Sequence, residues 1–250
     1  FRTFGMEVIA GSQNAGWSEV TVKEEGFRFT MDFRKVYWNS RLISEHKRLV
    51  RIIQDDVDLN NKQVVVADLM AGVGPFAVPL AGKGQREKRD HVRRVEVFAN
   101  DLNPDSYKYL KLNAENNGCG NSLQAFNMDA RDFVRMLQTK VERVDHVLMN
   151  LPASAPEFLD AFRGWQLPDL PRIHVHCFCT TDVVGDRPYY DKAIQRCEVA
   201  LGCGLDRDTV QVHEVRDVAP QKYMLCISFR LPDELRVETS KHQAKRVKVQ

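Results

Sequence analysis

From residue 64 onward the chain alternates between short, largely apolar runs and longer stretches of mixed polarity. The apolar runs lie at 64–66, 95–99, 123–127 and 146–149, and each leads into an acid or an asparagine. Short apolar runs that end in turn signals are typical of buried strands, whereas longer stretches such as 105–116 predict helices. Alternation of this kind predicts an α/β fold built on a mostly parallel, twisted sheet.

The last part of the chain predicts a different edge for this sheet. Helices are expected at 155–162 and 189–201, on either side of a strand at 172–179. Two more strands follow at 210–216 and 223–231, with a turn at 218–221 between them. Strands joined by so short a connection pair antiparallel, so we expect a carboxyl-terminal antiparallel hairpin that closes the sheet.

The residues before 38 alternate between apolar and polar in the manner of strands. Val20 and Val22 share one face, and Phe27, Phe29, Met31 and Phe33 do the same after a turn at 25–26. We therefore divide the chain into a small amino-terminal β region at 1–37, a catalytic domain at 38–232 and a polar, basic tail at 233–250.

The stretch 64–76 combines a strand, an acid (Asp68) and a turn that contains Gly72 and Gly74. Glycines in such a turn allow the backbone to approach a ligand closely, and Pro75 suits the first turn of a helix. A dinucleotide site needs a third glycine, which this stretch lacks, so a nicotinamide-dependent dehydrogenase is disfavoured. Taken alone, the glycine pair is also compatible with a purely structural turn.

Polar side chains at the other strand ends favour a ligand site. Asp101, Asp129 and Asn150 each follow a predicted strand. The carboxyl ends of parallel strands meet at one edge of the sheet, and an acid there accepts hydrogen bonds from ribose hydroxyls. A scaffold without a ligand has no need of this arrangement, so the pattern indicates a nucleoside-containing ligand.

Four stretches, at 1–11, 36–46, 68–76 and 150–153, resemble one family. It is the archaeal and eukaryotic type of tRNA guanine-37 N1-methyltransferase, a class I S-adenosylmethionine-dependent family. The resemblance covers nearly the whole chain; the second and fourth stretches are specific, whereas the third alone indicates only a methyltransferase. It implies a Rossmann-like class I methyltransferase fold, S-adenosyl-L-methionine as cofactor, and the anticodon stem-loop of tRNA with guanine at position 37 as partner.

The resemblance also implies catalytic roles. Glu45 matches the general base, Arg2 an arginine that contacts the target guanine, and Asn150 the asparagine beside the reacting base. Guanine N1 carries a proton at neutral pH, and a positioned base that removes it typically contributes ~10²–10⁴ in rate. An arginine aimed at O6 stabilises the charge that develops there. The alternative for Glu45 is a solvated acid at the helix start that pairs with Arg48 or Arg41. The alternative for Arg2 is a surface or terminal arginine without a catalytic role.

The cofactor pocket that the resemblance implies is formed by Tyr37, Arg41, His46, Asp68, Met70, Ala71, Gly72, Gly74, Asp101, Leu102, Asp129, Ala130, Asn150 and Pro152. At His46 some relatives have arginine. The connection at 83–94 is longer and more charged than in many relatives. Tyr37 and Trp38 either stack on an extruded base or pack between the two regions.

Bulk properties narrow the picture further. The formal net charge is only +2, with basic clusters at 83–94, 241–248 and 41–51 that suit either RNA phosphates or solvent. The six cysteines form no Cys-x-x-Cys pair, so we expect free thiols and no metal. No apolar run is long enough for a membrane span.

The first residue is not methionine and lies inside the first matching stretch, so we expect a truncated amino terminus. We expect a monomer that works in the cytoplasm, with the nucleus and the mitochondrial matrix left open as further compartments. Two alternatives to methyl transfer remain. One is the wybutosine-pathway aminocarboxypropyl transferase of the same superfamily, which needs no N1 deprotonation and is therefore disfavoured by Glu45 and the Asn150 motif. The other is a non-catalytic RNA-binding relative.

Overall fold

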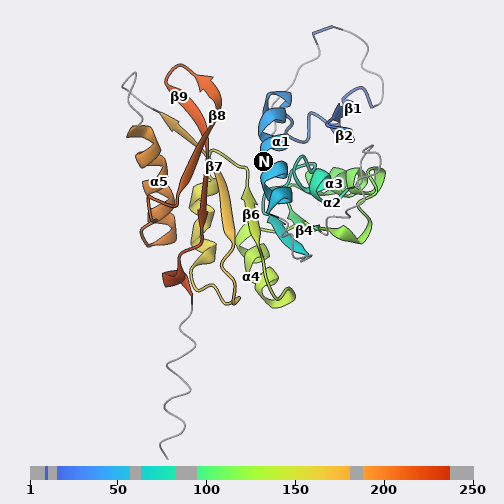
Figure 1. The fold of residues 1–250 in the computed structure, drawn as a ribbon. Helices are drawn as coiled ribbons and strands as arrows, with labels where there is room; N and C mark the ends of the chain where they lie inside the picture. Colours follow the sequence, from blue (N-terminus) through green and yellow to red (C-terminus); the bar gives the residue numbers. More distant parts are fainter. Residues whose placement is uncertain (1–8, 11–15, 57–62, 83–94, 181–187, 237–250) are drawn as a thin grey trace, which may run out of the picture.

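A seven-stranded sheet forms the centre of the computed structural model, which describes residues 9–10, 16–56, 63–82, 95–180 and 188–236 (Figure 1). The strand order is β5-β4-β3-β6-β7-β9-β8. The strands are β3 (Val64–Asp68), β4 (Val95–Asn100), β5 (Leu123–Phe126), β6 (His146–Met149), β7 (Arg172–Thr180), β8 (Gln211–Ala219) and β9 (Lys222–Arg230).

Strands β3 to β7 pair in parallel, whereas β9 is antiparallel to both β7 and β8. The hairpin between β8 and β9 turns at Pro220 and Gln221, where Gln221 adopts a positive φ of 58°. So short a turn leaves only the antiparallel pairing. The sheet therefore confirms the α/β fold with a carboxyl-terminal antiparallel hairpin that the sequence predicts.

The helices are α1 (Ile43–Asp55), α2 (Ala77–Ala81), α3 (Pro104–Asn116), α4 (Ala130–Lys140) and α5 (Pro188–Leu201), with short 3-10 helices η1 (Ser40–Leu42), η2 (Gly120–Ser122), η3 (Ala155–Phe162) and η4 (Asp233–Leu235). The helix expected at 155–162 is thus a 3-10 helix. The helix expected after Pro75 begins at Ala77, because residues 75 and 76 belong to the turn.

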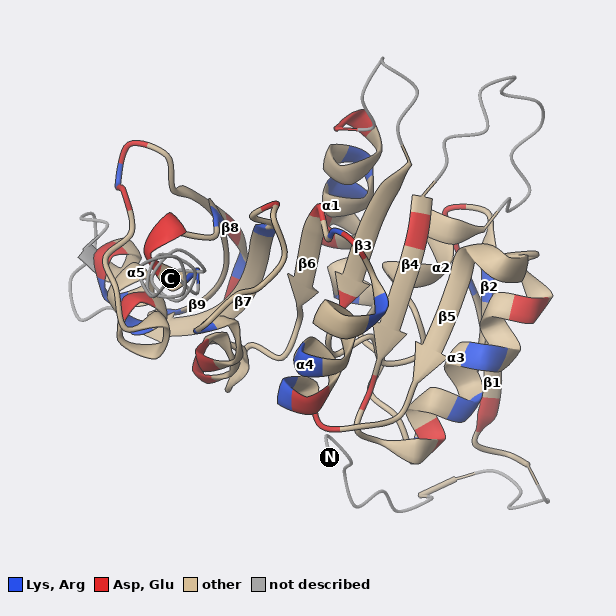
Figure 2. Cartoon of the chain, turned by 90° about the horizontal axis from the view of Figure 1, so that it is seen from below, with Lys and Arg blue, Asp and Glu red and all other residues tan. Residues whose placement is uncertain are grey.

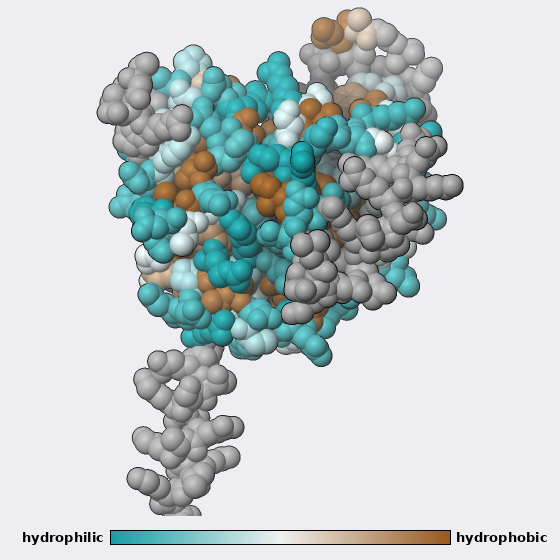
Figure 3. All heavy atoms as spheres, in the orientation of Figure 1, coloured by the Kyte–Doolittle hydropathy of each residue, from teal (hydrophilic) through white to brown (hydrophobic). Residues whose placement is uncertain are grey.

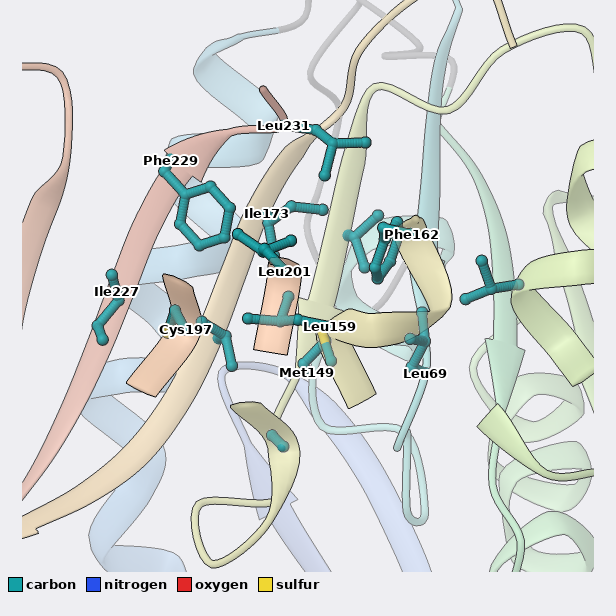
Figure 4. Packing of buried hydrophobic residues seen from close by; sticks show 14 of the residues in the cluster. Leu69, Met149, Leu159, Phe162, Ile173, Cys197, Leu201, Ile227, Phe229 and Leu231 are labelled. Atoms are coloured by element: carbon teal, nitrogen blue, oxygen red, sulfur yellow. The ribbon is translucent and has the colours of Figure 1, made fainter. Parts of the chain in front are cut away.

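Helices cover both faces of the sheet, and two hydrophobic clusters result. Figure 2 shows α1 and α4 on opposite faces. One cluster packs α4, η3 and α5 against β7 and β9; Figure 4 shows Leu159 and Leu201 of this layer facing Ile173. The other packs α1, α2 and α3 against the opposite face of β3 and β4. Since β3 is covered on both faces, its run of valines is buried throughout.

A separate two-stranded hairpin, β1 (Glu19–Glu24) and β2 (Phe27–Asp32), packs against α3. Phe27, Phe29 and Met31 belong to the same hydrophobic cluster as α1 and β3. The Asn113 side chain accepts a hydrogen bond from the Thr30 amide at 2.8 Å and donates one to the Thr30 carbonyl at 3.1 Å. The hairpin is therefore docked by apolar packing and by asparagine. The proposed division at residues 37 and 232 stays a prediction.

The face of the molecule shown in Figure 3 is mostly hydrophilic, and apolar residues lie on it in separate patches. None of the helices within the described ranges has the length and apolar character that crossing a bilayer requires.

Candidate functional site

A cavity of about 400 Å³ lies at the carboxyl ends of β3, β4, β5 and β6. Many of the residues predicted from the sequence line it: Tyr37, His46, Met70, Ala71, Gly72, Asp101, Leu102, Asp129, Ala130 and Asn150. They come together because parallel strands end at the same edge of the sheet. A concave site of this size, with few polar groups among apolar walls, suits a small organic ligand.

The two glycines of the turn have different surroundings. Gly72 has a φ of +56°, and no described atom lies within 4 Å of the place where a Cβ would stand, so its backbone faces open space. Gly74 has a φ of +98°, and a Cβ there would lie 2.7 Å from Val78 Cγ2 and 2.9 Å from Leu110 Cδ1. Gly72 therefore allows a ligand to approach, whereas Gly74 allows α2 and α3 to pack.

Asp101 connects the end of β4 to the glycine turn. Its Oδ2 accepts a hydrogen bond from the Gly72 amide at 2.8 Å, and its Oδ1 accepts one from the Asn103 amide at 2.8 Å. Burial raises the pKa of Asp101, although both hydrogen bonds oppose that rise. Each carboxylate oxygen has a second lone pair, so both retain capacity for a ligand.

Asp129 and Asn150 complete the polar set at the strand ends. Asp129 is the N-cap of α4, where its Oδ1 accepts a hydrogen bond from the Arg131 amide at 2.8 Å. Asn150 lines the cavity, and its buried Oδ1 has no hydrogen-bond donor among the described residues. A buried acceptor without a donor costs free energy, so this oxygen is suited to a donor on a bound ligand.

Four residues predicted to bind the cofactor do not line this cavity: Arg41, Asp68, Gly74 and Pro152. Asp68 is fully buried, and no side chain of the described residues donates to either carboxylate oxygen. Burial, together with the charge of Asp101, raises the pKa of Asp68 to about 8. It is therefore mostly uncharged at neutral pH.

Arg41 and Pro152 line a second pocket of about 230 Å³ instead. Phe178 and Arg216 also line it, and Tyr37 lines both pockets. The two spaces are thus adjacent, with the second lying between η1 and the strands β7, β8 and β9.

Glu45 lies in the first turn of α1 and is only 3% exposed. Arg48 donates from Nε to its Oε2 at 2.6 Å and from Nη2 to its Oε1 at 2.7 Å. His176 Nε2 donates to Oε1 at 2.8 Å. Burial favours the neutral acid, but the hydrogen bonds from His176 and Arg48 outweigh it and lower the pKa of Glu45 to about 2. The pairing with Arg48, one alternative drawn from the sequence, is present.

Glu45 does not line the main cavity, although its neighbour His46 does. Phe76, which lines the cavity, contacts both His46 and His176, with its ring centroid 4.9 Å from that of His46 and 6.1 Å from that of His176. On β7 the residue two beyond His176 is Phe178, which lines the second pocket. The Glu45 carboxylate therefore contacts a strand that also lines the second pocket.

Arg2 lies outside the described residues, as do the basic clusters at 83–94 and 241–248. The basic residues of α1 are described, and they pair locally: Arg48 with Glu45, Lys47 with Glu25 and Arg51 with Asp55.

Several residues that line the cavity are not among those predicted from the sequence: Asn39, Phe76, Asn103, Ser106 and Phe158. Asn103 follows Asp101 and precedes Pro104, so its position as the N-cap of α3 carried a signal. His176 is also absent from the predicted residues. It is a polar residue inside an apolar strand and is fully buried.

The family model for the TRM5/TYW2 methyltransferase domain matches residues 20–203. This chain belongs to the TRM5/TYW2 methyltransferase domain family. The match spans nearly all of the β1–β2 hairpin, the glycine turn and all four strand ends that border the cavity. It confirms the family resemblance drawn from the sequence.

Relatives within the TRM5/TYW2 family match over almost the whole chain. The tRNA (guanine(37)-N(1))-methyltransferase 1 of Phaeodactylum tricornutum is 54% identical over 262 residues, which cover 99% of this chain and 58% of the relative. The chain spans little more than half the length of the first curated relatives that it matches.

Two solved structures of TRM5/TYW2 proteins share the fold. The complex of aTrm5 and tRNALeu has a TM-score of 0.62 at 26% identity, covering 89% of this chain and 55% of that one. M. jannaschii TYW2 in complex with AdoMet has a TM-score of 0.62 at 25% identity, covering 90% of this chain and 89% of that one. They confirm the Rossmann-like class I methyltransferase fold.

Proposed function

We propose that this chain carries the catalytic domain of a tRNA methyltransferase, which transfers a methyl group from S-adenosyl-L-methionine to N1 of guanine 37. The observation that carries the proposal is a cavity at the strand ends in a chain 54% identical to a relative named tRNA (guanine(37)-N(1))-methyltransferase 1. Guanine 37 lies next to the anticodon, so tRNA is the proposed partner.

The residues around the cavity fit S-adenosylmethionine. Gly72 leaves room for a ligand at the turn, and the Asn150 Oδ1 needs a donor, which the ammonium group provides. Asp101 and Asp129 offer carboxylate oxygens where ribose and adenine are expected. The cofactor, when bound, supplies an electrophilic methyl group on a sulfonium. The proposed cofactor residues are those that line the cavity, with Asp68 behind them.

The proposed base is Glu45, which would take the proton from guanine N1. Its Oε1 accepts two hydrogen bonds, from Arg48 and His176, whereas its Oε2 accepts one, from Arg48. A carboxylate oxygen has two lone pairs, so Oε2 retains one for the N1 proton. A pKa near 2 makes the paired carboxylate a weak base, and RNA binding must loosen at least one of these hydrogen bonds.

The second pocket is the proposed entrance for the target base. It adjoins the cofactor cavity at Tyr37, and its Phe178 lies on β7 two residues beyond His176, which contacts Glu45. An aromatic wall suits a base that has left its stack, and Arg41 and Arg216 provide charge for the phosphates. Asn150 and Arg2 are proposed to contact the base itself.

The test uses unmodified tRNA transcript with guanine 37, radiolabelled S-adenosylmethionine and nucleoside analysis of the product. The proposal predicts label in 1-methylguanosine, and none when position 37 is adenine. A mass increase of an aminocarboxypropyl group would instead identify the TYW2 type of activity that the family also includes. No transfer, together with no cofactor binding by calorimetry, would leave an RNA-binding relative.

Three further points, predicted from the sequence, are proposals. They are a monomeric state, the absence of a membrane partner, and work in the cytoplasm with the nucleus and mitochondrial matrix left open. Size-exclusion chromatography with light scattering tests the first of them.

A further inference from the structure

Three polar residues lie side by side across β7, β9 and β8. His176 pairs in register with Cys226, and Cys226 pairs in register with His213. Residues paired directly across neighbouring strands point to the same face of a sheet. Glu45 reaches this row from α1: its carboxylate contacts His176 at 2.8 Å and lies 3.6 Å from His213 Nε2. The row therefore lies next to the carboxylate of Glu45, the proposed general base.

Two of the partners of Glu45 already present a hydrogen to it. The Arg48 guanidinium has only donors and keeps its charge in proteins. His176 Nε2 lies 2.8 Å from a carboxylate oxygen that can only accept, so this nitrogen carries its hydrogen. A proton that arrives on Glu45 consequently has no acceptor in Arg48 or in His176.

His213 is placed differently. Its Nε2 faces Oε2, the carboxylate oxygen with the spare lone pair, and its side chain is 47% exposed. Partial burial and the charges of Arg48 and His176 lower the pKa of His213, although Glu45 and Glu214 oppose this. The ring is therefore mostly neutral at neutral pH, with a lone pair available.

We propose that His213 is a positioning residue that takes the proton from Glu45 after methyl transfer and releases it to solvent. This inference rests on the proposed function. The N1–H bond of guanine breaks as an O–H bond forms on Glu45, and the N1 electron pair takes the methyl group from the sulfonium. The O–H proton then passes to His213 Nε2, and the imidazolium passes it to water or buffer, which restores the carboxylate.

Among the described residues that contact Glu45, His213 alone combines a free acceptor nitrogen with exposure to solvent. Cys226, the other member of the row, is fully buried and offers no direct way out. Glu45 is an anion before the first turnover, so the first methyl transfer needs no help from His213. Before every later turnover, His213 must first take the proton that Glu45 received in the previous one.

The experiment compares the first and later turnovers of His213→Ala on tRNA transcript with guanine 37. The first turnover is expected within about twofold of wild type, whereas the later rate falls about 10-fold, below the ~10²–10⁴ of a direct proton transfer. Imidazole buffer should restore the later rate, in proportion to its neutral form, and leave the first turnover unchanged. Gln211→Ala, on the same exposed strand, is the matched control. Its later rate should equal that of wild type, and imidazole should not change it.

The inference would be overturned if His213→Ala matched wild type in both its first and its later turnovers, or if imidazole did not restore a lost later rate. The methyltransferase function would stand in either case. A wild-type chain that forms no 1-methylguanosine would overturn both. A second measurement is independent of turnover: the nuclear magnetic resonance titration of His213. We expect a neutral ring at pH 7, and a ring that is protonated there would overturn the inference by itself.

Discussion

Asp101 holds two neighbouring strand ends together and faces the cavity at the same time. Its oxygens accept the Gly72 and Asn103 amides, both at 2.8 Å. Replacing it by alanine removes both acceptors and the expected ribose contact, so the Kd for S-adenosylmethionine should rise about 10-fold or more, since hydrogen bonds to charged groups contribute about 1.5–3 kcal/mol each. Calorimetry measures this.

The control is Asp105→Ala, in the first turn of α3, where the partly exposed carboxylate pairs with Lys35 at 3.6 Å. Its Kd should stay within about twofold of wild type. An unchanged Kd in Asp101→Ala would remove Asp101 from the cofactor site.

The residues at strand ends were predictable, because a parallel sheet brings its carboxyl ends together whatever its side chains are. Asp101, Asp129 and Asn150 therefore line one cavity, as expected. The surroundings of Glu45 were not predictable. Its contacts with His176 and His213 depend on the pairing of β7, β9 and β8 and on where α1 lies over them. No local pattern at residue 45 contains that information.

The glycine turn before α2 offers a matched pair of substitutions. Both glycines have a positive φ, which costs an L-residue about 1–2 kcal/mol. Only at Gly74 would the added Cβ also collide, with Val78 and Leu110. Gly74→Ala should therefore unfold at a lower denaturant concentration than Gly72→Ala. Overpacking should lower its free energy of unfolding by a further ~1–3 kcal/mol. Equal losses of stability would show that the α2–α3 contact tolerates the methyl group.

The docking of the β1–β2 hairpin depends on Asn113, which is fully buried. Its side chain bonds the Thr30 amide and the carbonyls of Thr30 and Val73. Asn113→Ala should lower stability by about 1–3 kcal/mol for each backbone group left unpaired and speed hydrogen exchange at the Thr30 amide. Glu115→Ala, at an exposed position of the same helix, should do neither. Unchanged exchange at Thr30 would contradict the proposed anchor.

Most elements followed from local patterns, and the exceptions have physical reasons. Helix α4 (Ala130–Lys140) is not among the predicted elements, although Asp129 caps it and its apolar positions 130, 133, 134 and 137 have helical spacing. Asp129 thus serves as a helix cap as well as a residue of the cavity wall. At 155–162 the periodicity predicted a helix correctly, but apolar spacing does not distinguish α from 3-10 geometry.

The stability of the whole molecule should fall in acid partly through Glu45. Its folded pKa of about 2 lies below the ordinary glutamate value of 4.5, so its contribution is present above pH 4.5 and is lost as pH falls toward 2. Glu45→Gln should be less stable than wild type at pH 7 by about 1–3 kcal/mol, and the difference should shrink between pH 4.5 and 2. A difference that stays constant over this range, in thermal melts, would contradict the buried ion pair.

The account's central claim is that Glu45 removes the N1 proton of a guanine held beside the cofactor cavity. Single-turnover methylation of guanine-37 tRNA transcript, with cofactor and RNA saturating and the fold checked at the assay temperature, tests it most directly. The account predicts that wild type forms 1-methylguanosine and that Glu45→Gln does so ~10²–10⁴ times more slowly. A variant as fast as wild type would contradict the claim.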